Sequence, residues 1–226
     1  MNDFRKYATK HLGVNSNTLD DYGKHLGKLI VPTNMTPYIM EERQLHVAQV
    51  DVFSRLMIDR VIWIIGEIDD INAAVVQAQL MYLDNSGERD ITIHVDSPGG
   101  SVYAGKKIIS VMEYVGCDVA TINTGLCASM GAVILAAGKK GKRCSLKYSR
   151  AMIHSTSGGA VGNIHDARIS MKEWERENEE LFGMLGDYCG KDVSEVQRDS
   201  ERDKWMSPKE AKEYGLIDSI VKSRRK

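Results

Sequence analysis

The chain has 226 residues, 42% of them hydrophobic, and a formal net charge of −1. This length and apolar content suit one compact domain with a sizeable core. The balanced charge, without a basic stripe, argues against nucleic-acid binding, and we interpret the basic end Lys222–Lys226 as a solvated tail.

Membrane, secretion and metal-binding signals are not found in the sequence. The longest apolar run, Ala132–Ala137, is too short to cross a membrane, and residues 1–28 lack the apolar stretch of a secretory signal. The cysteines have no metal-ligand spacing and are expected to be free thiols in a reducing compartment: Cys117, Cys127, Cys144 and Cys189. The sequence therefore predicts a cytoplasmic protein without a membrane span, metal or cofactor.

The beginning of the chain differs in composition from the rest. Residues 1–28 are polar, and glycine and asparagine are frequent around residues 13–17. We predict a flexible extension over 1–28 and one domain over 29–226, with Pro32 and Pro37 marking a non-helical lead-in.

Strand-like and helix-like segments alternate from residue 61 onward. The apolar run Val61–Ile65 indicates a strand buried on both faces, and a second strand, Ile91–Val95, is expected to stop at the turn Ser97–Gly100. Further strands are predicted at 118–123, 143–146 and 151–154, with helices from 69 to 83, from 100 to 115 and from 129 to 137. This succession favours an α/β fold with a parallel sheet and crossover helices.

The last third of the chain is more helical. Residues 158–162 are too rich in glycine for a core strand, and a long helix is predicted over Ile164–Cys189, ended by Gly190. Its apolar stripe suits either an arm that packs on a partner or ordinary core packing. Ser207–Glu210 forms a capping box that begins a short helix, and a last strand is predicted over Leu216–Val221.

Three segments contain residues that could carry chemistry. Ser129 lies among small residues at a predicted strand-to-helix turn, in the positive field of a helix N-terminus. Gly100 and Met130 have backbone N–H groups that could form an oxyanion hole there. His154 ends a short predicted strand and could reach the same sheet edge to act as a base. Taken singly, each segment also has a structural interpretation: tight helix packing, a plain turn and a core histidine.

Taken together, these segments resemble one protein family. The matching motifs occur in the family's order: Ser97–Gly100, Ala128–Ala132, Lys140–Arg143, Met152–His154, Glu201–Asp203 and Tyr214–Asp218. Over about residues 45–221 the chain resembles the proteolytic subunit of Clp proteases. The resemblance implies an α/β spiral fold shared with crotonases, with a protruding strand-helix handle at about 155–190.

The resemblance also implies an activity and the residues responsible for it. The chain would be a serine endopeptidase with Ser129 as nucleophile, His154 as general base and Asp203 as the orienting acid, and with Gly100 and Met130 as oxyanion donors. Asp199, four residues earlier, remains a rival for the third role.

The family's assembly supplies further expectations. Two stacked heptamers would enclose a chamber in which unfolded proteins are cut to short peptides. An AAA+ unfoldase such as ClpX, ClpA or ClpC would feed it, through a docking pocket that includes Thr92, His94 and Tyr114. Arg202 would reach a carboxylate of the opposite ring, although a solvated arginine is the simpler interpretation.

The chain departs from the family pattern at several positions, which suggests a divergent paralogue. Ser155 and Thr156 replace Gln-Pro, Asp96 replaces Asn, and Thr92 and His94 replace aromatic residues. Residues 1–28 have no clear counterpart and suggest a removable propeptide. Two alternatives stay open: a crotonase-fold acyl-CoA enzyme, and a non-catalytic ring subunit of a mixed Clp complex.

Overall fold

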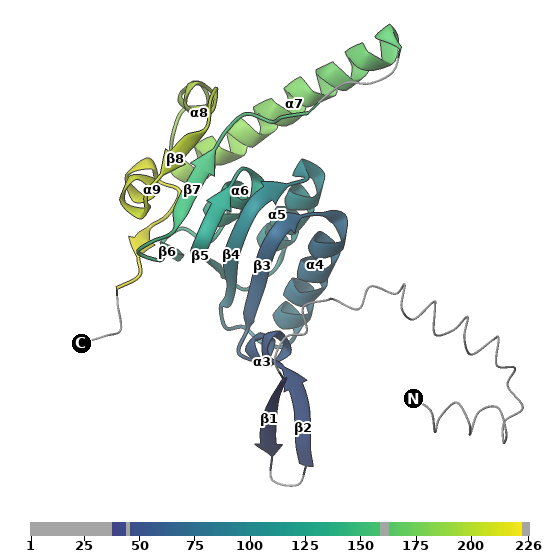
Figure 1. Ribbon diagram of the computed structural model, residues 1–226, viewed down its shortest axis with the longest axis vertical. Helices are drawn as coiled ribbons and strands as arrows, with labels where there is room; N and C mark the ends of the chain where they lie inside the picture. Colours follow the sequence, from purple (N-terminus) through teal and green to yellow (C-terminus); the bar gives the residue numbers. More distant parts are fainter. Residues whose placement is uncertain (1–37, 44–45, 159–162, 223–226) are drawn as a thin grey trace, which may run out of the picture. The chain divides into compact units, whose positions relative to one another are not determined.

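The computed structural model of the protein describes residues 38–43, 46–158 and 163–222 (Figure 1). The predicted extension over 1–28 and the glycine-rich stretch at 159–162 lie outside these residues. The chain divides into two compact units, Met1–Val52 and Phe53–Lys226. In the first, β1 (Tyr38–Arg43) and β2 (His46–Asp51) form an antiparallel hairpin that the sequence analysis did not predict.

The second unit is built on a largely parallel sheet. Its strands are β3 (Val61–Ile68), β4 (Ile91–Gly100), β5 (Val119–Ala128), β6 (Arg143–Ser145), β7 (Arg150–Ile153), β8 (Lys204–Met206) and β9 (Ser219–Ile220). They pair in the order β3-β4-β5-β6-β9, and β7 pairs with β5 and with β8. Only the β7–β8 pair is antiparallel among the described strands of this sheet. The predicted α/β class with a parallel sheet is confirmed.

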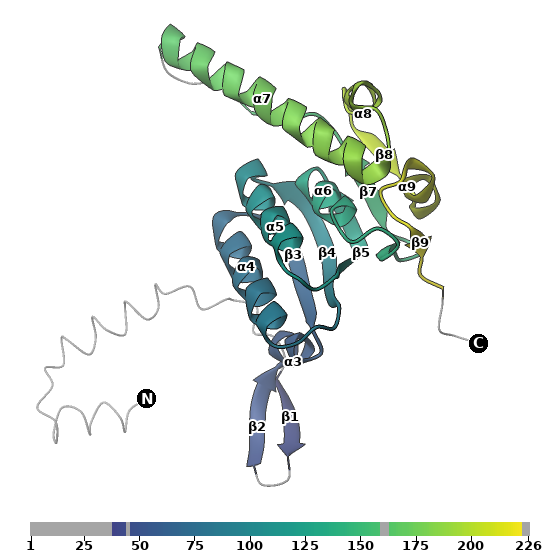
Figure 2. The same cartoon turned by 180° about the vertical axis from the view of Figure 1, so that it is seen from behind.

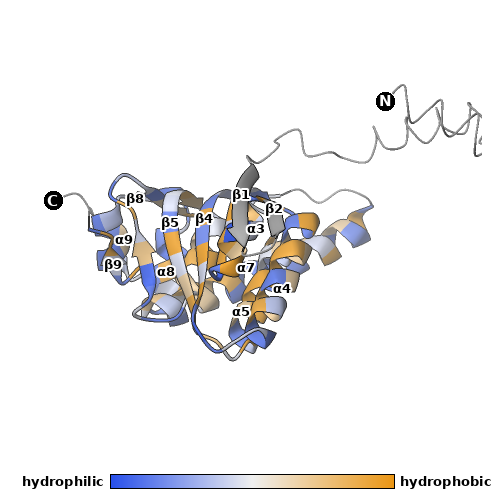
Figure 3. Cartoon of the chain, turned by 90° about the horizontal axis from the view of Figure 1, so that it is seen from below, coloured by the Kyte–Doolittle hydropathy of each residue, from blue (hydrophilic) through white to orange (hydrophobic). Residues whose placement is uncertain are grey.

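Crossover helices connect the first parallel strands. They are α4 (Asp70–Asn85), α5 (Val102–Tyr114) and α6 (Met130–Ala136), preceded by the short α3 (Val52–Ile58). Asp69 caps α4 by accepting a hydrogen bond from the backbone N–H of Asn72 at 2.7 Å. Figure 2 shows α4, α5 and α6 side by side on one face of the sheet. The apolar stripes of α4 and α5, which alternate with polar residues in Figure 3, bury the core against the strands.

The first strand of this sheet is buried on one face, not on both as predicted. Ile62, Ile64 and Ile68 are buried under the helices, whereas Ile65 is 52% exposed. The apolar run was misleading because the helices of the described chain cover only one side of β3, β4 and β5. The opposite face remains accessible, and it carries the cavity described below.

The predicted turn at Ser97–Gly100 is also wrong, because β4 continues to Gly100. Gly99 and Gly100 pair with Glu67 and Ile68 of β3 after a register shift. Both glycines have positive φ, +104° and +150°, and a Cβ on Gly100 would lie 2.3 Å from the carbonyl oxygen of Ile68. The strand therefore continues because glycine tolerates this backbone and this close approach.

The long helix α7 (Ile164–Cys189) forms with the predicted bounds and ends at Gly190, whose φ is +69°. In Figure 1 its first turns extend away from the sheet, and Ile164 and Ile169 are 65% and 69% exposed. Its second half packs into the core through Leu181, Phe182 and Leu185. The apolar stripe thus serves core packing in one half and is exposed in the other.

The chain ends in short elements. The sequence analysis did not predict α8 (Val193–Asp199) or β8, whereas the capping box of α9 (Pro208–Tyr214) is confirmed. The last predicted strand shrinks to β9, two residues long. No helix in the described ranges is long and apolar enough to cross a membrane.

Candidate active site

Ser129 stands at the junction of β5 and α6 in a strained conformation. Its φ is +53°, one of two positive values among the described non-glycine residues. Its backbone N–H donates to the carbonyl of Met152 at 2.8 Å, which anchors it to β7. Although Ser129 occupies the N-cap of α6, its hydroxyl makes no capping bond. The Oγ atom is therefore available to another partner.

That partner is His154, which follows β7. Because β7 runs parallel to β5 with Met152 opposite Ala128, a residue two positions on lies beside Ser129. Nε2 of His154 is 2.8 Å from Oγ of Ser129, a normal hydrogen-bond length. The chain after the histidine is fixed as well, since the N–H and hydroxyl of Ser155 both donate to the carbonyl of Ser200, at 2.7 and 2.9 Å.

The antiparallel pairing of β7 and β8 decides which aspartate lies near the histidine. Ile153 is opposite Lys204, so the next position along each strand places His154 opposite Asp203. An Asp203 carboxylate oxygen lies 3.4 Å from Nδ1 of His154. The rival Asp199 is instead paired with Lys204 at 2.9 Å. Burial opposes ionisation of Asp199, but the hydrogen bond and charge of Lys204 outweigh it and lower its pKa.

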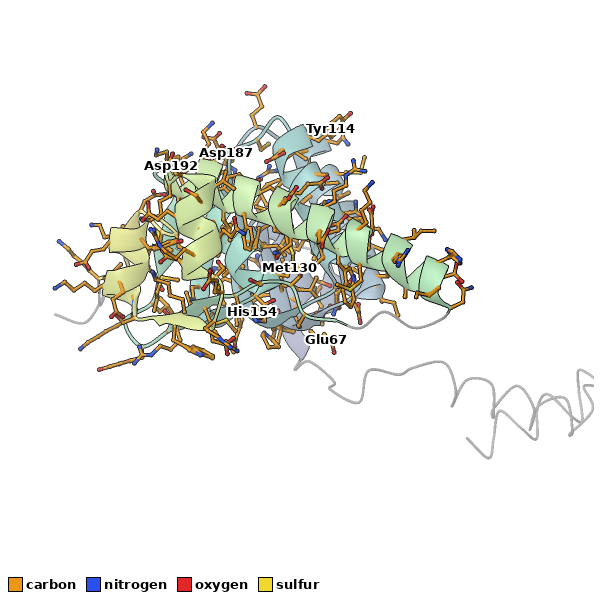
Figure 4. The ribbon with its side chains drawn as sticks, turned by 90° about the horizontal axis from the view of Figure 1, so that it is seen from above. Glu67, Tyr114, Met130, His154, Asp187 and Asp192 are labelled. Carbon is orange, nitrogen blue, oxygen red and sulfur yellow. The ribbon has the colours of Figure 1, made fainter. Side chains whose placement is uncertain are left out.

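The oxyanion candidates share one cavity with the serine and histidine. The cavity has a volume of about 70 Å³. It is lined by Gly100, Val102, Ser129, Met130, Val133, Ile153, His154, Thr156, Ser157, Leu181 and Leu185. Figure 4 shows Met130 and His154 close to α7. We call this space the catalytic cavity; its apolar walls from α5 and α7 were not predicted, since those residues read as ordinary core positions.

Gly99 controls how closely β4 approaches the serine. A Cβ at this position would lie 2.6 Å from the Cβ of Ser129 and 3.1 Å from the backbone nitrogen of Met130. The first distance is shorter than real Cβ atoms show and the second is tighter than most Cβ contacts, so glycine is required beside the nucleophile candidate. The glycines of Ser97–Gly100 therefore serve close approach at the site rather than a turn.

Asp96, which raised the prospect of an opposing charge, is engaged elsewhere. Its Oδ1 accepts a hydrogen bond from the N–H of Leu126 at 2.8 Å, where β5 departs from regular pairing with β4. It lines a different cavity, on the open face of the sheet. The carboxylate is thus committed to the β5 backbone and is not among the residues lining the catalytic cavity.

This second space, the sheet-face cavity, contains one of three residues predicted for a docking pocket. It is lined by Trp63, His94, Asp96, Ile122, Thr124, Leu146, Lys147, Tyr148, Ile220, Val221 and Lys222. The His94 ring lies 4.5 Å from the Trp63 ring, and burial lowers its pKa. Thr92 and Tyr114 are not in the lining, and Tyr114 is 77% exposed at the end of α5. Trp63 was missed as a pocket residue. It alternates with the buried Ile62 and Ile64, so it lies on the open face of the sheet, where His94 is its neighbour on β4.

Arg202 is exposed beside the histidine and aspartate. It lines a shallow surface pocket with His154, Ser155, Thr156, Glu201 and Asp203. Within the described part of the chain it forms no salt bridge. No cluster of metal-ligating side chains occurs in those residues either, and all four cysteines are free.

Comparison with known proteins places this chain in a family. The profile of the family described as Clp protease matches residues 43–224. The chain is 52% identical over its full length to the ATP-dependent Clp protease proteolytic subunit of Porphyromonas gingivalis, all of which it covers. It is 50% identical to the subunits of that name from Bacteroides fragilis and Bacteroides thetaiotaomicron, over 98% of this chain and 99% of each relative.

The chain belongs to the Clp protease family. Identity of about half over the full length makes it a proteolytic subunit of the ATP-dependent Clp type, with the serine peptidase activity of that subunit. The resemblance noted in the sequence is confirmed, and a crotonase-fold acyl-CoA enzyme is excluded as an alternative.

Proposed function

We propose that Ser129, His154 and Asp203 form the catalytic triad of this peptidase, with Gly100 and Met130 as oxyanion donors. The observation that carries the proposal is the 2.8 Å contact between His154 Nε2 and the hydroxyl of the strained Ser129. A serine hydroxyl becomes a useful nucleophile only when a base takes its proton, and this contact supplies the base.

The steps follow from the roles of the three side chains. Asp203 favours the imidazole tautomer with the proton on Nδ1, so Nε2 is free to accept the Ser129 proton as Oγ attacks the peptide carbonyl. The N–H groups of Gly100 and Met130 stabilise the oxyanion that develops. His154 then protonates the leaving amine, and water repeats the sequence to release the acyl group.

The assembly proposed for the subunit follows the family. Two heptameric rings would stack around a closed chamber, and an AAA+ unfoldase would deliver unfolded proteins into it. Proteolysis would take place in the cytoplasm, which is consistent with the four free cysteines. Residues 1–28 would be a removable extension, and Arg202 would join the rings. These roles rest on full-length similarity to subunits named for an ATP-dependent protease.

The docking pocket for the unfoldase is proposed at the sheet-face cavity, centred on His94. Thr92 lies on the same face of β4, and Tyr114 would contribute from another position on the docking surface. The Trp63 ring packs against His94 and adds apolar area to this pocket. The sequence analysis considered only positions 92 and 94 and did not count this area. The absence of the family's aromatic residues at 92 and 94 still favours weaker anchoring of a standard apolar loop.

Active-site labelling tests the proposed triad. A fluorophosphonate probe should modify Ser129, and Ser129→Ala should abolish both labelling and hydrolysis of a short fluorogenic peptide while the assembly persists. Loss of a triad nucleophile costs on the order of 10⁶ in turnover. Labelling at another residue, or a wild-type assembly that the probe does not modify, would refute the triad.

A further inference from the structure

A buried acid stands in the middle of α7, where the apolar stripe faces the core. Glu177 has a side chain only 8% exposed. Its carboxylate oxygens accept hydrogen bonds from Nζ of Lys106, on α5, at 3.1 and 3.3 Å. Glu180, one turn further along α7, binds the same ammonium group. Ion pairs at Lys106 therefore connect α5 and α7, two helices that are distant in sequence.

The position of this ion pair relates it to the catalytic cavity. On α5, Lys106 lies one turn after Val102; on α7, Glu177 lies one turn before Leu181. Val102 and Leu181 both line the catalytic cavity. Because residues four apart lie on the same face of a helix, the ion pair and the two cavity walls belong to the same contact between α5 and α7.

Neighbouring contacts extend this arrangement to the segment that follows His154. Asn178, adjacent to Glu177, accepts hydrogen bonds from the N–H and hydroxyl of Thr156, at 3.0 and 3.3 Å. Thr156 also lines the catalytic cavity. A shift of α7 relative to α5 would therefore move Leu181 directly and Thr156 through Asn178, and both residues line the cavity.

An ion pair is an unusual choice at this depth. Two apolar side chains of similar size would hold the helices together at least as well, since burying charges offsets much of their attraction. The charged pair differs from an apolar contact because its hydrogen bonds are directional. They form only at a particular separation and orientation of the two helices. Although burial opposes it, the hydrogen bonds and charges of Glu180 and Glu177 raise the pKa of Lys106, so the Lys106 ammonium group stays charged near neutral pH.

We propose that the Lys106–Glu177 ion pair is a specificity-determining clamp: it fixes the separation of α5 and α7 and so sets the size of substrate side chain that the catalytic cavity accepts. The inference rests on the proposed function, because the cavity is a substrate pocket only if Ser129 is the nucleophile. Neither charged group lines the cavity, so both are positioning residues that act through Val102 and Leu181.

The test compares substrate preference with intrinsic reactivity of the serine. Lys106→Met and the double variant Lys106→Met/Glu177→Leu are assayed on fluorogenic peptides that differ only in the residue before the cleaved bond: Ala, Leu or Phe. The double variant leaves no unpaired buried acid and keeps the test valid where the single variant fails to fold. Lys107→Met is the matched control, because Lys107 forms an exposed pair with Asp70 on α4.

The clamp predicts a change in preference without a change in nucleophile reactivity. The ratio of kcat/KM for Phe to that for Ala should shift on the order of 10-fold in both variants, as expected when an apolar pocket changes by about a methylene. Lys107→Met should leave the ratio unchanged, and the rate of labelling by a small fluorophosphonate should match wild type throughout. Variants are compared only on fractions that sediment like wild type.

Two outcomes would overturn the clamp. One is an unchanged ratio in the folded double variant; the other is an equal loss on all three peptides, which would make the pair a purely structural contact. Failure of the proposed function gives a different result, because the wild-type protein would then not be labelled at Ser129.

Discussion

The carboxylate of Asp203 lies 3.4 Å from Nδ1 of His154, and the aspartate side chain is 58% exposed. This distance exceeds the 2.8 Å between His154 and Ser129, and it exceeds the usual length of a hydrogen bond to an ion. Catalytic hydrogen bonds are often long in the absence of substrate and shorten when the site is occupied. The aspartate is thus the looser of the two contacts to the imidazole.

Replacing each aspartate by asparagine distinguishes the two candidates for the orienting acid. Asp203→Asn should lower kcat by up to about 10⁴-fold, because an amide can hold the wrong imidazole tautomer. Asp199→Asn should lower kcat by no more than about threefold, since Asp199 binds Lys204 in a partly exposed pair that contributes about 1 kcal/mol at most. Peptidase assays on both variants give the ranking, and the reverse order would assign the role to Asp199.

The sequence indicated the residues of the candidate site more clearly than the contacts between them. Ser129 and His154 could be placed at one sheet edge because each follows a recognisable strand. Asp203 could not be separated from Asp199 on spacing, because β8 is three residues long and its register against β7 decides the matter. Short edge strands carry too little pattern to be read from composition.

Two other features escaped prediction for different physical reasons. The apolar run Val61–Ile65 did not show that one sheet face is open, because exposed apolar residues look the same as buried ones in sequence. The buried Glu177 was hidden among exposed acids of α7, where charge normally indicates the solvent side. In both cases tertiary packing, rather than local pattern, determines burial.

Asp96 is expected to position β5, which leads into the proposed nucleophile Ser129, through its bond to the N–H of Leu126. Asp96→Asn keeps an acceptor oxygen and should leave kcat within about twofold of wild type. Asp96→Leu removes the acceptor, leaves the Leu126 N–H without its partner and should lower kcat roughly 10- to 100-fold, as small misplacements of reacting groups do. Fluorophosphonate labelling rates should fall in parallel. Equal activity of the two variants would show that the bond does not affect Ser129.

The Asp218–Arg143 pair should make stability depend on acid. Asp218 binds the guanidinium of Arg143 at 2.7 Å, and Arg143 is only 3% exposed. Burial opposes ionisation of Asp218, but the Arg143 hydrogen bonds and charge prevail and lower its pKa. A depressed folded-state pKa gives stabilisation that is complete above the unfolded-state pKa of about 3.9 and is lost as pH falls below it.

Asp218→Asn should therefore lower the free energy of unfolding by about 3 kcal/mol at pH 7, because it leaves a buried guanidinium without its carboxylate. The difference from wild type should shrink as the pH falls below about 4. Thermal unfolding followed from pH 3 to pH 8 measures both. A difference that stays constant across this range would mean that the charge of Asp218 makes no contribution, and Asp70→Asn, in an exposed pair, is the control.

Arg202 is expected to join the two rings of the proposed assembly and so to link assembly to activity. The side chain is exposed beside His154 and Asp203, and within the described residues no carboxylate pairs with it, which leaves its charge available to another subunit. A symmetric double ring repeats such a contact in every subunit, so a small loss at each site multiplies. Because Arg202 adjoins Asp203, its release should also disturb the backbone that holds this proposed orienting acid.

Arg202→Ala should give single rings in which Ser129 is present but poorly activated, while Arg202→Lys retains part of the contact through its charge. Arg198→Ala, an exposed arginine at the end of α8, is the matched control and should remain a fully active double ring. Sedimentation velocity and peptidase assays on the same samples measure assembly and activity together. If the Arg202→Ala protein stays an active double ring, Arg202 is a solvated surface residue and the rings are joined by other contacts.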